Sequence, residues 1–163
     1  MSDKRVVAVV MGSQNDYEKV EPGINVLKEF GVSAAVRILS AHRTPQEVQK
    51  FVNESEKEGI KVFICAAGMA AHLAGVVASH TTRPVIGIPI ASGALNGVDS
   101  LYSTVMMPPG IPVATVAING AQNAAYLALE IIQESVPGIS EKLKEHKKKM
   151  AEKVLEADKL IQK

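Results

Sequence analysis

The chain has 163 residues, with 18 lysines and arginines against 17 aspartates and glutamates. This length suits one domain with a substantial core, and the near-neutral charge provides no overall field to recruit nucleic acid or a membrane surface. Aromatic residues make up 4% of the chain and tryptophan is absent, so aromatic stacking can have only a small share in ligand binding.

The N-terminus and the single cysteine bear on location. The charged residues 3–5 lead into only six apolar residues, which is too short for a signal peptide or a membrane span. Cys65 lies inside an apolar run; a lone buried thiol excludes a disulfide framework and fits a reducing compartment. We therefore expect a cytoplasmic protein that binds neither membranes nor nucleic acid.

Alternating strand and helix patterns run through most of the chain. Apolar, β-branched runs predict strands at residues 6–11, 35–39, 62–66, 85–88 and 113–117. Helical spacing of apolar residues predicts helices at 17–30, 45–58, 69–80 and 121–134. Strands without in–out alternation are buried on both faces, as in parallel sheets. The pattern therefore predicts one doubly wound α/β domain over residues 1–163.

Residues 40–45, Ser-Ala-His-Arg-Thr-Pro, join a predicted strand to a predicted helix. Thr44 followed by proline, with Glu47 three residues on, is the pattern of a capping box. His42 and Arg43 then lie in a turn at the positive end of a helix. Arginine suits phosphate, the helix start adds free N–H groups, and histidine exchanges protons near neutral pH. A catalytic site for a phosphorylated substrate is one interpretation; a surface turn with two solvated basic residues is the other.

The first strand ends in a second polar stretch. In doubly wound sheets the ligand crevice lies beyond the carboxyl ends of the strands. There, Gly12 allows a tight turn, Ser13 and Asn15 offer polar contacts, and Asp16 could accept hydrogen bonds from ribose hydroxyls. The alternative is that Ser13 or Asn15 merely caps the following helix. The stretch matches neither the dinucleotide-binding pattern G-x-G-x-x-G nor the phosphate-binding loop pattern G-x-x-x-x-G-K-[ST].

The third strand runs into residues 66–75, which contain two glycines and five alanines. Such small residues let the backbone approach a flat ligand closely. His72 falls at the start of a predicted buried helix. It can be a packed, hydrogen-bonded residue or a catalyst, and the first interpretation is the more ordinary one.

Two later stretches suggest contacts between subunits. After the fourth strand, Asp99 is expected to cap a short helix that ends at Met106, and residues 106–112 form either ordinary core cover or a subunit contact. Residues 140–163 predict a lysine-rich helix with a thin apolar stripe, formed by Leu143, Met150, Val154, Ala157 and Ile161. A narrow stripe on a polar helix requires a partner surface. It could fold back on its own domain, but we favour docking on a neighbouring subunit.

Four motifs together resemble the PurE family of purine biosynthesis. They are residues 40–45, residues 11–16 (Met-Gly-Ser-Gln-Asn-Asp), residues 70–73 (Ala-Ala-His-Leu) and residues 97–103 (Gly-Val-Asp-Ser-Leu-Tyr-Ser), in a match running from about residue 6 to residue 135. The resemblance implies a three-layer, flavodoxin-like or Rossmann-like subunit with a central parallel sheet. It also implies a C-terminal oligomerisation helix at about 140–161, extending to a neighbouring subunit of a homo-octamer with sites at subunit boundaries.

The resemblance further implies a phosphoribosyl aminoimidazole substrate and no metal or organic cofactor. Carried over by position, Ser13, Asp16 and Arg43 match ribose-phosphate ligands, and His42 matches the general acid/base. The remaining substrate-site residues are Gly12, Asn15, Ser40, Ala41, Gly68, Ala70, His72 and Leu73, the last four in the wall over the imidazole. Asn15 stands where serine is common in the family, and Ala74 where proline is common.

The family has two types. The mutase type moves a carboxylate from the exocyclic nitrogen of 5-(carboxyamino)imidazole ribonucleotide to ring carbon 4, whereas the carboxylase type uses free carbon dioxide and aminoimidazole ribonucleotide. Residues 70–73 resemble the mutase spelling, so we expect a mutase, with the carboxylase as the alternative. A non-enzymatic phospho-receiver would need acidic residues at the ends of the first and third strands, and this chain has none there. A flavin- or nucleotide-binding module is weakly supported, because the chain has few aromatic residues for stacking.

Overall fold

Five parallel strands form the central sheet of the computed structural model, which describes residues 5–162. They are β1 (Val7–Met11), β2 (Ala34–Ile38), β3 (Val62–Gly68), β4 (Val85–Ile90) and β5 (Ala114–Thr115). Their order across the sheet is β2-β1-β3-β4-β5, which is the flavodoxin-like arrangement. The predicted doubly wound α/β fold is confirmed.

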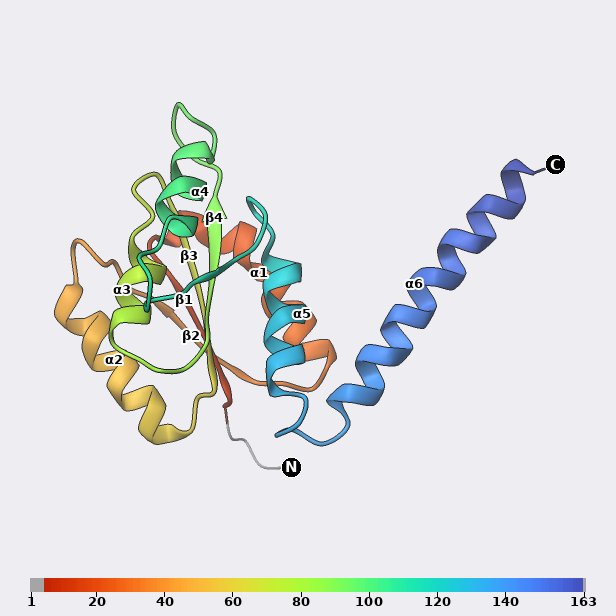
Figure 1. Cartoon of the computed structure of the whole chain (residues 1–163), viewed down its shortest axis with the longest axis horizontal. Helices are drawn as coiled ribbons and strands as arrows, with labels where there is room; N and C mark the ends of the chain where they lie inside the picture. Colours follow the sequence, from red (N-terminus) through yellow and green to blue (C-terminus); the bar gives the residue numbers. More distant parts are fainter. Residues whose placement is uncertain (1–4, 163) are drawn as a thin grey trace.

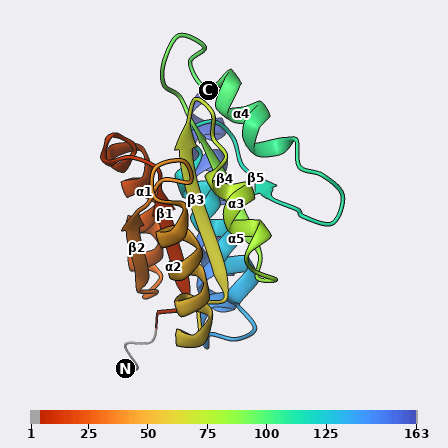
Figure 2. The same ribbon diagram turned by 90° about the vertical axis from the view of Figure 1, so that its left-hand side faces the viewer.

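Helices cover both faces of this sheet. The described residues form the helices α1 (Tyr17–Glu29), α2 (Pro45–Glu58), α3 (Leu73–Ser79), α4 (Val98–Val105), α5 (Ala121–Ile132) and α6 (Ile139–Ile161), with a 3₁₀ turn, η1 (Gln14–Asp16), before α1. Figure 1 shows α1 and α5 on one side of the strands and α2 and α3 on the other. Figure 2 shows α4 at the end of the sheet where β4 terminates.

Burial on both faces explains the continuous apolar runs of the inner strands. In β1, Val7, Val9 and Met11 pack into the cluster that includes α1 and α5. Ala8 and Val10 point the other way and pack with α2 and α3. Successive side chains of a strand face opposite sides of the sheet, so a strand covered by helices on both sides has to be apolar at every position.

The fifth strand is shorter and less buried than its sequence predicts. Only Ala114 and Thr115 pair with β4, opposite Ile86 and Gly87, whereas a buried strand over residues 113–117 was expected. Ala114 is exposed and Thr115 half-buried. Because β5 is the edge of the sheet, it has one neighbour and incomplete cover.

Two helix starts also differ from prediction. The helix expected at 69–80 begins only at Leu73, because Met69 has φ +52°, a left-handed conformation that an α-helix cannot contain. It ends at Ser79. At α4 the cap is Gly97, with φ 97°, and Asp99 lies in the first turn, so the predicted Asp99 cap is wrong.

The predicted capping box at Thr44 is absent. Thr44 occupies the cap position of α2 and makes no side-chain cap hydrogen bond. Its hydroxyl instead donates to the Ser40 carbonyl at 3.1 Å and accepts from the Ser40 N–H at 2.9 Å. This pair of bonds closes the turn that carries His42 and Arg43.

The C-terminal helix α6 extends away from the rest of the subunit (Figure 1). Near its start, Ile139 and Leu143 are buried, and the His146 ring stacks on Tyr126 with centroids 4.6 Å apart. From Met150 onward every described residue of the chain is exposed. The helix therefore does not fold back along its own domain. Within residues 5–162, no helix combines the length and apolar character needed to cross a membrane.

Candidate active site

A cavity of about 380 Å³ opens at the carboxyl ends of β1 and β3. Every catalytic or substrate-site residue proposed from the sequence lines it, and so do Ala67, Met69 and Ser92. The former group comprises Gly12, Ser13, Asn15, Asp16, Ser40, Ala41, His42, Arg43, Gly68, Ala70, His72 and Leu73. The fold thus gathers four separate loops into one site, although their individual roles stay predictions.

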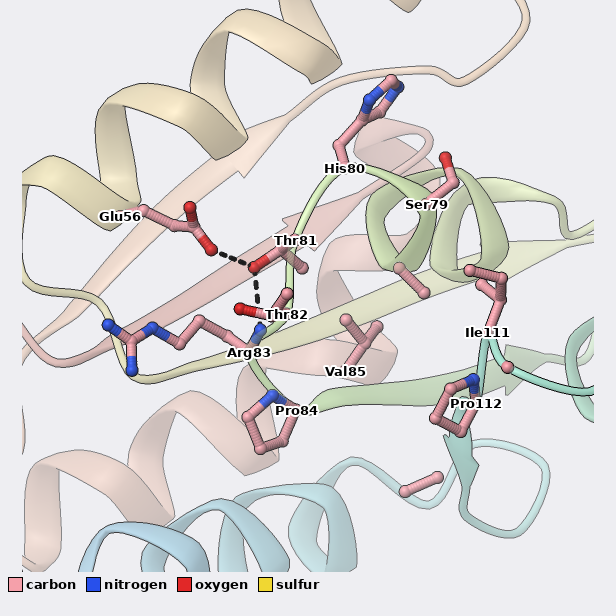
Figure 3. A pocket seen from close by; sticks show the side chains of 13 residues that line it. Glu56, Ser79, His80, Thr81, Thr82, Arg83, Pro84, Val85, Ile111 and Pro112 are labelled. Carbon is pink, nitrogen blue, oxygen red and sulfur yellow. Dashed lines mark hydrogen bonds between the residues drawn. The ribbon is translucent and has the colours of Figure 1, made fainter.

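A larger cavity, of about 800 Å³, lies where α3 ends and β4 and β5 begin. Its polar groups do not converge: Figure 3 shows the His80 ring and the Arg83 guanidinium on different sides of it, while Thr81 bonds to Glu56. The C-terminal end of a helix presents carbonyls and partial negative charge, which disfavours anions. The cavity at the carboxyl ends of the strands is therefore the better candidate for a phosphorylated ligand.

The loop after β1 is held by reciprocal capping bonds. The Asn15 N–H donates to Ser13 Oγ at 3.2 Å, and the Ser13 N–H donates to Asp16 Oδ2 at 3.1 Å. Ser13 is therefore a helix cap, as one of the two interpretations held, and it also faces the cavity. Asp16 is only 7% exposed. Burial raises the pKa of its carboxyl, although the Ser13 N–H, Lys19 and Arg43 act in the opposite direction.

The turn between β2 and α2 places Arg43 in the cavity lining, in contact with the loop after β1. Ser40 Oγ accepts from the Arg43 backbone N–H at 3.2 Å and from its Nε at 3.4 Å. The Arg43 Nη2 group donates to the Gly12 carbonyl at 3.0 Å. These contacts use some of the five guanidinium N–H donors and orient the exposed fork between the β1 and β2 loops.

His42 and His72 form a hydrogen-bonded pair. His42 Nε2 lies 2.9 Å from His72 Nδ1, with the ring centroids 5.0 Å apart and the planes at 85°. One of these nitrogens donates while the other accepts. His72 is hydrogen-bonded, as its more ordinary interpretation held, but it is not packed within a buried helix, because it precedes α3 and is exposed. The sequence held a signal for the pair, since both residues follow parallel strands whose ends share one edge.

The opposite wall depends on close backbone packing. A Cβ at Gly68 would stand 2.2 Å from Ser92 Oγ and 3.3 Å from the Ile90 carbonyl, so this position requires glycine while Ser92 keeps its place. Ser92 was not predicted as a site residue. The length and small residues of the loop after β4 were the only signal, and they do not identify which residue turns toward the cavity.

Comparison with known proteins places the chain among similar enzymes. The family model described as AIR carboxylase matches residues 6–153. The N5-carboxyaminoimidazole ribonucleotide mutase of Pyrococcus horikoshii is 49% identical over 161 residues, covering 99% of this chain and 91% of the relative. That of Saccharolobus solfataricus is 51% identical over 149 residues, covering 91% and 94%.

Solved structures agree with the sequence comparisons. The crystal structure of Treponema denticola PurE superposes with a TM-score of 0.86 at 34% identity, covering 94% of this chain and 96% of that one. The family match over residues 6–153 includes every residue that lines the cavity. The chain belongs to the AIR carboxylase family, which confirms the PurE resemblance.

Proposed function

We propose that this protein is a mutase of purine biosynthesis that converts 5-(carboxyamino)imidazole ribonucleotide into 4-carboxy-5-aminoimidazole ribonucleotide. The observation that carries the proposal is that His42 and an oriented Arg43 line the same cavity. An anion anchor beside a proton carrier fits a phosphorylated substrate that must gain and lose a proton. The names of the relatives described above support the same reaction.

Binding begins with the phosphate and ribose. Arg43 offers a charge-assisted fork to the phosphate, and Ser13 lines the same cavity with its hydroxyl-bearing side chain. Asp16 accepts from ribose hydroxyls, because an ionised carboxylate is an acceptor only. The imidazole then lies against the wall that includes Gly68 and Ala70.

The reaction exchanges a C–N bond for a C–C bond. His42 donates a proton to the exocyclic nitrogen, the carbamate C–N bond breaks with its electron pair left on nitrogen, and carbon dioxide is released within the site. Ring carbon 4 then attacks carbon dioxide. The proton on that carbon returns to His42, so one histidine serves as acid and then as base. Retaining carbon dioxide in a small-residue cavity makes the second step effectively unimolecular.

Assays with two substrates test this proposal. The purified protein should convert the carbamate to product without added bicarbonate. It should be slow with aminoimidazole ribonucleotide plus bicarbonate. Product formation only from the second mixture, at a rate useful to a cell, would move the assignment to the carboxylase type.

We also propose that the protein assembles into the homo-octamer that the family resemblance implies, with α6 docked on a neighbouring copy. Val154 is 67% exposed, Leu160 72% and Ile161 84%, and solvent contact with so many apolar side chains is unfavourable. Light scattering at micromolar concentration should show an assembly of eight chains. A fully active, monodisperse monomer would contradict this proposal.

A cytoplasmic location is part of the same proposal. Cys65 is a free, buried thiol, and burial raises its pKa, which keeps it in the unreactive thiol form. Purine synthesis from a free ribonucleotide substrate takes place in the same compartment as the nucleotide pool. Fractionation of cells that carry the tagged protein would test the location directly.

A further inference from the structure

The backbone of Ala91 is held from two sides, through its N–H and through its carbonyl. Ala91 directly follows β4, and its carbonyl accepts a hydrogen bond from Lys19 Nζ, on the first turn of α1. Its N–H donates to Asn119 Oδ1 at 3.0 Å. The two contacts come from segments 72 residues before and 28 residues after Ala91 in the sequence, so tertiary structure alone brings them together.

The next residue, Ser92, forms part of the candidate active site. It lines the cavity and lies so close to Gly68 that a Cβ there would overlap Ser92 Oγ at 2.2 Å. The position of this wall therefore depends on the backbone of Ala91, the residue before Ser92. Fixing the N–H and the carbonyl of Ala91 restricts both the position of Ser92 and the direction in which the chain leaves β4.

Asn119 has an unusual backbone conformation that supports a specific role. Its φ is +58°, in the left-handed region where glycine is favoured over any residue with a Cβ. Its own N–H donates to the Pro89 carbonyl at 2.8 Å, and its carbonyl accepts from the Ala121 N–H at 2.9 Å. Glycine could make both backbone bonds without strain, so the amide side chain is the part that glycine could not supply.

Lys19 is half-buried and carries a charge toward the same corner of the site. Besides contacting the Ala91 carbonyl, it acts on Asp16: burial raises the pKa of that carboxyl, and the charges of Lys19 and Arg43 oppose the rise. A hydrogen bond from a cation is stronger than one between neutral groups. The ammonium group thus connects the η1 loop, which holds the predicted ribose ligand, with the loop after β4.

We propose that Lys19 and Asn119 are positioning residues that clamp the backbone of Ala91, one at its carbonyl and one at its N–H, and thereby hold Ser92 as a wall of the ribonucleotide cavity. The proposal rests on the function proposed above. Neither residue lines the cavity. Asn119 acts through Ala91 and Ser92, and Lys19 acts through the same two residues and through its charge beside Asp16. Loosening this wall weakens binding of substrate and transition state equally, which raises KM and leaves kcat nearly unchanged.

The test compares Lys19→Met, Asn119→Gly and the double variant with the parent protein. Each single change should raise KM for the carbamate roughly tenfold, the scale expected for loss of a hydrogen bond to a charged group or of its buried partner. Because both residues hold the backbone of one residue, Ala91, on either side of its Cα, the double variant should lose much less than the product of the two single effects. Lys19→Arg keeps the charge and the donor, so it should recover part of the loss.

Lys50→Met is the matched control, because it removes an exposed lysine from α2. It should leave KM unchanged. Hydrogen exchange, which requires no activity, should show faster exchange of the amides at residues 91–97 in Lys19→Met and Asn119→Gly but not in the control. A simple loss of folded protein would lower the measured kcat without changing KM, so the two explanations separate.

Unchanged KM and unchanged exchange at residues 91–97 in both single variants would overturn the proposal. So would fully multiplicative effects in the double variant, because they would mean that the two residues act independently. Failure of the proposed function has a different signature. In that case the parent protein forms no product from the carbamate, whereas the exchange difference at residues 91–97 still tests the clamp.

Discussion

Replacing each of the two paired histidines by asparagine should give unequal effects. Asparagine keeps a hydrogen-bond donor of moderate size but cannot carry a proton at neutral pH. His42 is the predicted proton carrier, and its Nε2 is 2.9 Å from His72 Nδ1. Hence His42→Asn removes the carrier itself, whereas His72→Asn removes only one partner that orients it.

The structure sets the expected magnitudes. Loss of a general acid/base costs roughly 10²- to 10⁴-fold in turnover. Loss of a single neutral hydrogen bond costs about 0.5–1.5 kcal/mol, or roughly 2- to 12-fold. Both rings are exposed, so neither change leaves a cavity in the core, and both variants should unfold at nearly the parent temperature. His42→Asn should therefore lose at least about 10²-fold in kcat, and His72→Asn about tenfold or less.

The assay measures turnover of the carbamate and binding of aminoimidazole ribonucleotide for both variants side by side. Binding should be largely retained by each, because Arg43 and the η1 loop are untouched. The bound substrate could then persist in crystals of His42→Asn long enough to be observed. If His72→Asn abolished turnover while His42→Asn kept near-normal rates, the assigned roles would be reversed.

Four other outcomes are expected. Arg43→Ala should weaken ribonucleotide binding by roughly 30-fold, since a charge-assisted contact is worth about 2 kcal/mol; unchanged binding in calorimetry would mean that Arg43 is not the phosphate anchor. Gly68→Ala should raise KM without unfolding the protein, because the new Cβ overlaps Ser92 Oγ. Asp16→Asn should raise the melting temperature at pH 7 and weaken ribonucleotide binding. Burial raises the pKa of Asp16 in the folded state, so the stability of the parent protein falls as pH rises from the ordinary carboxyl pKa of 3.8 through the folded pKa. The gain in melting temperature of Asp16→Asn over the parent should therefore vanish in melts below pH 3.8. Val154→Glu should break the assembly into smaller species in light scattering while leaving the circular dichroism spectrum of the fold intact; an unchanged assembly would exclude Val154 from the interface.

The sequence by itself determined the fold class and the location of the site. Continuous apolar runs such as residues 62–66 require burial on both faces of a strand, and glycines such as Gly59 end helices through local backbone geometry. Parallel strands place the loops that follow them at one edge. Consequently the sequence is enough to assign the polar residues after β1, β2 and β3 to one edge of the sheet.

Tertiary structure alone decided the contacts between those loops. No local pattern shows that the His42 and His72 nitrogens meet, that Ser92 packs on Gly68, or that Lys19 reaches Ala91, because each distance depends on helix packing between remote segments. Local rules also failed in two of the loops that line the site. The Thr44 hydroxyl binds the Ser40 backbone instead of capping α2, and Met69 adopts a left-handed conformation that shortens the predicted helix to Leu73–Ser79. Periodicity and capping patterns depend on neighbours within one turn, whereas the geometry of this site depends on residues 30 or more positions apart.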